Sequence, residues 1–493
     1  MKKILPWAAG IAVAVLFGVL LAWRMAGGPS GPASTDGPFA LGGEGDPAGR
    51  EVWLSAFQND DKIGWSHRKL TREDGAWFLL EESFLRINAM GAVQPIRVKT
   101  TARLYPDLTL KSFDFSLGSN LVSFSASGRM EGRTLVLSTG GPDEGTETKI
   151  ELPRPPYLGA GLMFASRVAE MDVGESRSFP LFDPATLGTS PATVEVVGEE
   201  TITVMGEEHR AKKVKLTFMG NSQSAWIGED GEVLREKAML GLRMERADRQ
   251  TALDMSGSGQ SADLVDLASV PVDVTIPDPS SLALLKVRVD TPREFPGMDG
   301  GRQTFADRVL TVAKETLPDP AADPGKDVSQ DPDLAPYLEA GPFIRSDHPQ
   351  VIRAAQEIVS PQDPPVVRAK KIVSWAHTEL EKRPVFSAPE ALATLRTRMG
   401  DCNEHAVLVA ALARAARVPA RMEVGLTYME GRFYYHAWDA FYLSGQWITG
   451  DAVFGQFPAD VTHLRFASGA PKTQLEIMGL LGRVNLEILE FSQ

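Results

Sequence analysis

The sequence of 493 residues predicts an α+β protein whose first half is rich in antiparallel strands. Three observations predict this class. Between about residues 49 and 265, apolar and polar residues alternate in short runs, which is typical of strands with one buried face. Beyond residue 346 the apolar period changes to three and four residues, as in helices, and later returns to two. Glycine and proline, 45 and 34 residues, supply the many turns that such a chain needs.

The N-terminus predicts a membrane anchor over residues 1–25. Lys2 and Lys3 precede an uncharged run from Ile4 to Trp23, which is long enough for a helix to cross a bilayer. We expect an uncleaved signal anchor, a single-pass transmembrane helix with the bulk of the chain outside the cytoplasm, in the periplasm. A cleaved signal peptide, with secretion to the periplasm, is the alternative.

Four further segments follow in order. Residues 26–48 are rich in Gly, Pro and small polar residues and predict a flexible linker. Residues 49–265 predict the β-rich region, as one long sheet or as two β-domains, with Asp230 and Gly231 forming a two-residue hairpin turn. Residues 266–345 predict a connecting segment that includes a strap rich in Pro and Asp. Residues 346–493 predict a domain in which helices pack on an antiparallel sheet.

Composition limits the partners. The formal net charge is −13, and an acidic surface repels phosphate backbones, so we expect no nucleic-acid binding. The membrane, through the N-terminal helix, and a peptide or protein substrate remain as expected partners.

A single cysteine, Cys402, stands at a predicted helix start. Asp401 is a good N-cap residue, and Glu404 follows at the spacing of a capping box. Cys402 would then be the first helical residue, where the helix dipole and free N–H groups stabilise a thiolate. The sequence therefore predicts an activated nucleophile.

A nucleophilic cysteine needs a base and a group that orients the base. His436 lies in a predicted strand, and a short hairpin would return Asp451 to its side. Trp438 lies on the same face of that strand as His436, and we expect it to form an aromatic wall of the site or of the core. His405 is adjacent to the nucleophile in sequence, but we expect its side chain to turn away, toward the surface or a supporting position.

The five other histidines form no metal-ligand spacing, and we expect none of them in the site; they are His67, His209, His348, His377 and His463.

These motifs resemble the transglutaminase-like superfamily, in its bacterial cell-envelope branch. The resemblance covers about residues 346–457 and follows four segments in order: Gly400-Asp401-Cys402, Val418-Pro419-Ala420-Arg421, His436-Ala437-Trp438 and Asp451. It implies a papain-like fold and a Cys402-His436-Asp451 triad. The family's usual Asp-Pro-Thr ending is replaced here by Asp451-Ala452-Val453.

The resemblance implies a cysteine acyl-transfer enzyme acting on peptide-type amides, as a peptidase, an amidase or a transglutaminase. A thiol and an imidazole need no metal or other cofactor, and no acidic calcium loop is recognisable. Two alternatives remain. The domain would be a catalytically silent scaffold or binding module whose β-region recognises a cell-envelope partner, or the enzyme would carry a β-region that binds lipid or protein.

Overall fold

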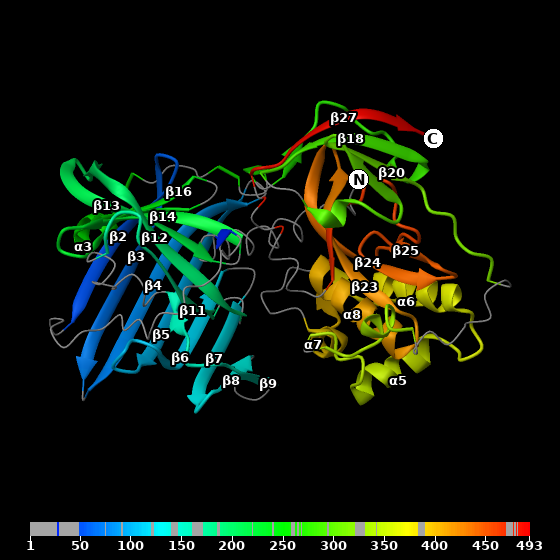
Figure 1. Cartoon of the computed structure of the whole chain (residues 1–493), viewed down its shortest axis with the longest axis horizontal. Helices are drawn as coiled ribbons and strands as arrows, with labels where there is room; N and C mark the ends of the chain where they lie inside the picture. The colour runs from blue at the N-terminus through cyan, green and yellow to red at the C-terminus, as the bar shows by residue number, and fades with distance from the viewer. Residues whose placement is uncertain are drawn as a thin grey trace. The chain divides into compact units, whose positions relative to one another are not determined.

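The computed structural model describes residues 27–28 and 49–493, apart from residues 74, 90–91, 120–122, 140–145, 160–170, 185–187, 219, 239–240, 258–261, 264–265, 268, 293–294, 321–330, 342, 383–389, 470–476, 478–479 and 481. The described residues up to 263 form one compact unit, and those from 266 onward form another. The two units are described separately, and their elements are labelled in Figure 1.

The N-terminal unit is built on one sheet of 16 strands, so both β-rich blocks of the sequence belong to a single sheet. Each strand pairs with its neighbours in the order β10 to β16 and then β2 to β9, and β1 pairs with β14. Among the described strand pairs of this unit, β10–β11 is the only parallel one. The β16–β2 pair joins the two blocks, which answers the question that the sequence leaves open.

The bounds of the elements of this unit are β1 Gly27–Gly28, β2 Arg50–Gln58, β3 Asp61–Glu73, β4 Ala76–Ala89, β5 Ala92–Leu104, β6 Leu110–Gly118, β7 Ser123–Glu131, β8 Thr134–Thr139, β9 Thr146–Glu151, β10 Tyr157–Leu158, β11 Ser176–Asp183, β12 Gly188–Val204, β13 Glu207–Phe218, β14 Gly220–Gly228, β15 Val233–Lys237, β16 Leu242–Ala247 and α3 Arg249–Leu253.

Alternation of residue type explains these strands. In β6, Phe113, Phe115 and Leu117 are buried, while the residues between them are more exposed. The hairpin between β14 and β15 has a longer turn than the sequence predicts, because residues 229–232 all lie outside the strands. Asp230 accepts a hydrogen bond from the N–H of Glu232, and Gly231 takes a φ of 75°, a conformation that suits glycine.

The predicted membrane helix over residues 1–25 lies outside the described residues, as does most of the predicted linker. Gly27 and Gly28 of that linker pair with β14 as strand β1. Within the part of the chain that the structure describes, no helix combines the length and the apolar character that a bilayer crossing requires.

The C-terminal unit places helices against a five-stranded sheet with the order β17-β24-β23-β26, in which β25 also pairs with β24 (Figure 1). This arrangement agrees with the predicted α+β class. Helix α8 is the central element, because it packs against the other three helices and against β23 and β24. Its residues from Val407 to Ala413 are all fully buried.

The bounds in this unit are β17 Val270–Pro271, η2 Pro279–Ser281, β18 Leu284–Asp290, η3 Pro296–Met298, β19 Gln303–Ala306, β20 Val309–Ala313, η4 Ala335–Tyr337, α5 Pro349–Ile358, α6 Pro365–Glu379, β21 Glu381–Lys382, α7 Ala391–Thr397, β22 Met399–Gly400, α8 Cys402–Ala415, β23 Ala420–Met429, β24 Arg432–Leu443, β25 Gln446–Gly450, β26 Leu464–Gly469 and β27 Asn485–Ser492.

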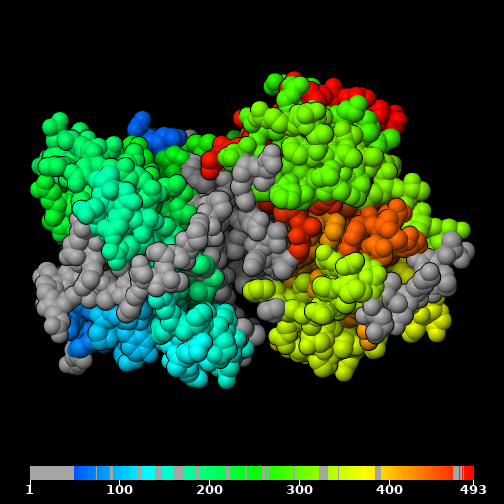
Figure 2. Space-filling model, in the orientation of Figure 1, coloured from blue at the N-terminus to red at the C-terminus, as the bar shows by residue number. Residues whose placement is uncertain are grey.

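The segment 266–345, which the sequence predicts as a connector, belongs structurally to this unit. Its strands β18, β19 and β20 form a four-stranded sheet with the C-terminal strand β27, in the order β19-β20-β18-β27. In Figure 2 the red residues of the C-terminal strand lie on the light-green residues of this sheet. Leu285 and Val287 of β18 are fully buried, so the segment has a core and is not a simple spacer.

Candidate active site

Helix α8 begins at Cys402, the residue at which the sequence predicts a helix start. The Asp401 carboxylate accepts a hydrogen bond from the N–H of Asn403 at 2.8 Å. Glu404 reaches back to accept the N–H of Asp401 at 3.0 Å, which completes the predicted capping box. The capping box therefore fixes the first turn of α8, and with it the direction of the Cys402 side chain.

Gly400 is required here by close packing. A Cβ at this position would lie 2.3 Å from the Cβ of Glu404, well inside contact distance. The strand pair β21–β22 holds Gly400 beside Lys382. The segment before the helix therefore packs directly on the capping residue.

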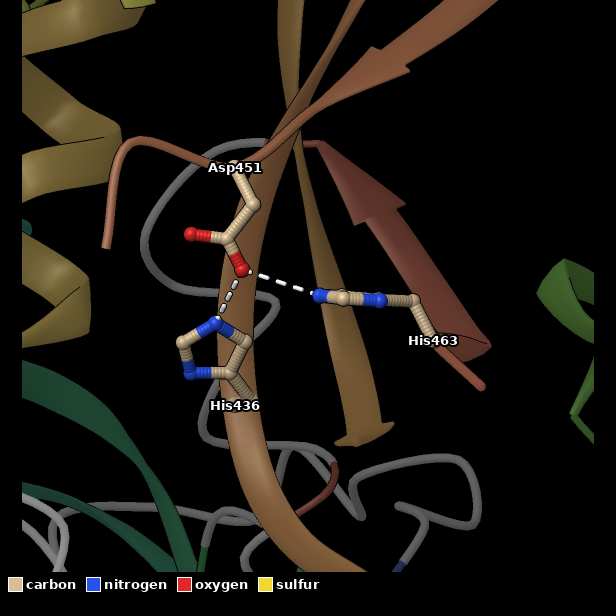
Figure 3. Close-up of side chains that lie close together, drawn as sticks. All are labelled: His436, Asp451 and His463. Atoms are coloured by element: carbon tan, nitrogen blue, oxygen red, sulfur yellow. Dashed lines mark hydrogen bonds and ion pairs between the residues drawn. The ribbon is translucent and has the colours of Figure 1, made fainter. Parts of the chain in front are cut away.

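The hairpin of β24 and β25 brings His436 and Asp451 together. Asp451 follows the last residue of β25, and its Oδ2 lies 2.6 Å from Nε2 of His436 (Figure 3). The Oδ1 atom accepts the backbone N–H groups of Val453 and Phe454 at 2.6 and 3.0 Å. Both side chains of the His436–Asp451 pair are fully buried.

This contact determines which nitrogen of His436 carries the proton. Although burial alone would raise the pKa of Asp451, the two histidines at its carboxylate hold that pKa well below its usual range. An ionised carboxylate only accepts, so Nε2 of His436 donates and Nδ1 keeps a free lone pair. Among the described residues, that buried Nδ1 has no hydrogen-bond partner.

Cys402 lies at the edge of the same strand. Its sulfur accepts a hydrogen bond from the backbone N–H of Ala437, the residue after His436. On the β24 edge opposite β23, β17 pairs as far as Phe433 and β25 pairs from Asp439 onward. Ala437, whose N–H donates to the sulfur of Cys402, lies between these two pairings.

The electrostatics differ from the expected thiolate. Burial, followed by the neighbouring carboxyl of Asp401, raises the pKa of the Cys402 thiol well above its usual value. Only 8% of Cys402 is exposed. Burial and Asp401 likewise raise the pKa of Glu404 well above its usual value. The loss of water and the nearby acids outweigh the helix dipole, so the resting sulfur is a thiol.

Trp438 is fully buried, and its ring centroid lies 6.1 Å from that of His436. Its Nε1 donates to Glu423 at 3.1 Å. Glu423 also accepts from Arg421 at 2.8 Å and from Arg465 at 3.1 Å. The indole N–H is therefore already engaged with Glu423.

A family model supplies the identification. The transglutaminase-like superfamily core matches residues 352–452, a range that contains Cys402, His436 and Asp451. Residues 352–452 belong to the transglutaminase-like superfamily. Among curated proteins, none matches the chain.

Solved structures show distant likeness. A candidate cysteine protease from Cytophaga hutchinsonii is 16% identical, with 43% of this chain and 84% of that chain covered and a TM-score of 0.28. A beta-barrel-like protein of a domain of unknown function from Brucella abortus is 11% identical, with coverages of 41% and 98% and a TM-score of 0.31. A candidate protease from Parabacteroides distasonis is 9% identical, with coverages of 67% and 64% and a TM-score of 0.20. TM-scores this low carry no inference about function.

The transglutaminase-like domain has a second histidine at its aspartate, and the expectation that His463 is unrelated to the site is wrong. Nε2 of His463 lies 2.9 Å from Oδ2 of Asp451 (Figure 3). The loop from Asp451 to β26 brings His463 back to the site, and its path cannot be read from residue spacing. The feature of the local sequence that could have indicated a role for His463 is Asp460, three residues earlier. Its carboxylate bonds the other ring nitrogen of His463 at 3.2 Å.

The remaining histidines lie elsewhere or support the domain. His405 is buried, so a surface position is excluded, and its Nδ1 donates to the backbone carbonyl of Asp401 at 2.7 Å. Burial lowers the pKa of His405 to about 4, which keeps it neutral. His377 bonds the carbonyl of Ala452 at 3.0 Å, next to the catalytic candidate Asp451.

One group of described residues has ligand atoms close enough together to hold a metal ion. It consists of His436, Asp451 and His463, whose ligand atoms lie within 4.8 Å of one another. Two ligands of one tetrahedral zinc at about 2.1 Å lie about 3.4 Å apart. The two nitrogen–oxygen distances at Asp451 are 2.6 and 2.9 Å, which are hydrogen-bond lengths. The arrangement therefore fits shared protons and not a bound cation.

Proposed function

We propose that the transglutaminase-like domain catalyses acyl transfer at peptide-type amides. Cys402 would be the nucleophile, His436 the general base and acid, and Asp451 the residue that orients His436. The observation that carries the proposal is the free, buried Nδ1 of His436, next to the residue whose N–H binds the sulfur of Cys402.

The thiol of Cys402 and the unpartnered Nδ1 of His436 suggest how the reaction begins. As the sulfur of Cys402 bonds to the amide carbon, its proton passes to Nδ1 of His436, and Asp451 stabilises the imidazolium. The same proton then passes to the leaving amine as the carbon–nitrogen bond breaks. Water or a second amine next attacks the thioester, gives its proton to His436, and releases the sulfur, which regains that proton.

The N–H of Cys402 is the first candidate for stabilising the carbonyl oxygen in the transition state. It lies at the first position of α8, where backbone N–H groups lack intrahelical acceptors. Trp438 is a poorer candidate, because its N–H already donates to Glu423.

A second function is favoured by the burial of Cys402. With 8% of the residue exposed and a protonated thiol, the domain would serve as a catalytically silent scaffold whose β-region binds a cell-envelope partner. The two functions differ in one measurable property, since only the enzyme requires His436 to activate Cys402.

The rate of alkylation of Cys402 by iodoacetamide, measured from pH 4 to pH 10, tests this property. Wild-type protein is compared with His436→Ala, and His209→Gln in the N-terminal unit is the matched histidine control. An enzyme gives a rate at pH 6 at least about tenfold higher in wild type and in the control than in His436→Ala. Equal rates in all three proteins would contradict the proposal and favour the scaffold.

Products would then separate hydrolysis from transfer. A mixture of cell-envelope peptides with a biotinylated primary amine is incubated with wild type and with Cys402→Ala. New peptide termini that depend on Cys402 indicate a peptidase or amidase, and incorporation of the amine indicates a transglutaminase.

We also propose a membrane-anchored location with the enzyme outside the cytoplasm. The support is the sequence alone, in the uncharged run from Ile4 to Trp23 after two lysines. Extraction of membranes with alkaline carbonate tests the anchor, because an integral protein stays in the pellet. Release of a shortened, soluble chain would instead support a cleaved signal peptide.

A further inference from the structure

His463 occupies a position that the proposed chemistry has not used. It lies between β25 and β26, with its side chain 1% exposed. Its two ring nitrogens contact two different carboxylates, Asp451 at 2.9 Å and Asp460 at 3.2 Å. A neutral imidazole has only one N–H, so it cannot donate to both.

The partners of both carboxylates identify them as acceptors. Oδ1 of Asp460 also accepts the N–H and the hydroxyl of Thr462 at 2.9 and 2.6 Å. Its Oδ2 accepts from Gln456 at 2.8 Å. Asp451 accepts four hydrogen bonds, two at each oxygen. Both groups are therefore carboxylates, and the histidine between them must be doubly protonated.

The charges around His463 agree with this state. Burial alone would lower its pKa, but Asp460 and Asp451 overcome that effect and raise it to about 9. His436 faces it from β24, with ring centroids 5.8 Å apart. Arg302, ahead of β19, binds the backbone carbonyl of His463 at 3.3 Å. The uncharged rings of Trp438 and Phe454 pack against His463 edge to face, with ring centroids 5.2 and 5.7 Å away.

We propose that His463 is a positioning residue, a buried imidazolium that fixes the carboxylate of Asp451 against His436 and keeps that carboxylate ionised. This inference rests on the proposed function. By occupying the second lone pair of Oδ2, His463 prevents Asp451 from rotating or from taking up a proton. His436 then keeps its proton on Nε2 and its lone pair on Nδ1, the nitrogen that the proposed mechanism assigns to the proton of Cys402.

The four-stranded sheet supports this arrangement from outside the family match. Arg302 binds the carbonyls of Ala459 and His463, at the two ends of the short segment that carries Asp460. Gln303 is buried and bonds the backbone of Arg465 in both directions, at 2.7 and 3.1 Å. The loop that carries His463 is thus held to β19 as well as to Asp451.

Imidazole nitrogen signals of the full-length protein, labelled with ¹⁵N-histidine, test the inference directly. In wild type we expect both nitrogens of His463 to be protonated up to about pH 9, and His436 to carry its proton on Nε2. In His463→Ala, Asp451 would become protonated at higher pH, so His436 would populate the Nδ1–H form. The acid limb of the Cys402 alkylation profile would move to higher pH, and the rate would fall about 10- to 100-fold.

Two further variants separate orientation from folding. His463→Gln restores a neutral donor to Asp451, and we expect it to recover the Nε2–H form of His436 but to leave the acid limb shifted. His209→Gln should match wild type in every measurement. The inference is overturned if His463 loses a proton near pH 6.5, or if His463→Ala leaves both the His436 tautomer and the acid limb unchanged.

Failure of the proposed function would look different. Alkylation that does not depend on His436 would contradict the enzyme, whereas the tautomer of His436 in His463→Ala would still decide the role of His463.

Discussion

Nε2 of His436 and Oδ2 of Asp451 lie 2.6 Å apart in a site from which solvent is excluded. Because the aspartate can only accept, this one contact leaves the other imidazole nitrogen available as a base. It is the relationship on which the first prediction depends.

Replacing Asp451 by Asn should remove the base without removing the histidine. Because Oδ1 accepts two backbone N–H groups, the amide oxygen would take its place and the amide NH2 would face both imidazoles. His436 would then have to accept at Nε2 and carry its proton on Nδ1. We expect turnover, or His436-dependent alkylation of Cys402, to fall by about 10³- to 10⁴-fold. Asp230→Asn, in the exposed hairpin of the N-terminal unit, should change either rate less than about twofold. A loss below tenfold in Asp451→Asn would contradict the assigned tautomer.

Glu404→Gln should stabilise the protein at neutral pH. Burial raises the pKa of Glu404 above its ordinary 4.5, so the folded chain retains a proton that the unfolded chain releases. The wild type therefore loses stability as the pH rises above that value, whereas glutamine mimics the protonated acid at every pH. Urea unfolding at pH 5 and pH 8 should show Glu404→Gln gaining on wild type at the higher pH. Glu404→Ala, which loses the cap, should be less stable by about 1 kcal/mol or more.

Stability should also depend on His463 in the alkaline range. Since the folded pKa is about 9 and the ordinary value is 6.5, this contribution is complete below pH 6.5 and is lost as the pH rises through 9. For a single fully buried group the loss is on the order of 3 kcal/mol. The contribution of His463 is the unfolding free energy of wild type minus that of His463→Gln, measured at each pH. A difference that stays constant from pH 6 to pH 9.5 would show that His463 is neutral.

Gly400→Ala should disturb the first turn of α8. The added methyl group would lie 2.3 and 2.9 Å from Cβ and Cγ of Glu404, so the cap or the helix end must move. We expect a loss of about 1–3 kcal/mol in unfolding free energy, with slower alkylation of Cys402. Gly341→Ala is the matched control, because its methyl group would meet no atom within 4 Å. Equal stability of the two variants would argue against tight packing at Gly400.

Local patterns explain how much of this molecule the sequence predicts. The spacing of Asp401 and Glu404 predicts the residue at which α8 begins, because a cap is a contact between near neighbours, and the period of apolar residues predicts the helix that follows. His436 and Asp451 are joined by one short hairpin, so their approach also follows from local structure.

Contacts between distant segments were beyond the reach of such patterns. The strand Leu284–Asp290 pairs with Asn485–Ser492, whose residues lie far along the chain, and nothing in either sequence indicates this pairing. His463 reaches Asp451 through a loop without regular structure, whose path depends on Arg302 and Gln303. The protonation state of the Cys402 thiol depends on its burial, and that burial is determined only once the core is assembled.

The attachment of β19 to the loop before β26 bears on how this protein could be divided. A fragment cut at residues 352 and 452 would keep Cys402, His436 and Asp451 but would lose His463, Arg302 and β23's partner strand β26. Such a piece would carry every residue of the triad and still expose a sheet edge and an unsupported carboxylate. The smallest autonomous domain should therefore run from near residue 266 to residue 493, so that grafting or miniaturising it requires the segments on both sides of residues 352–452.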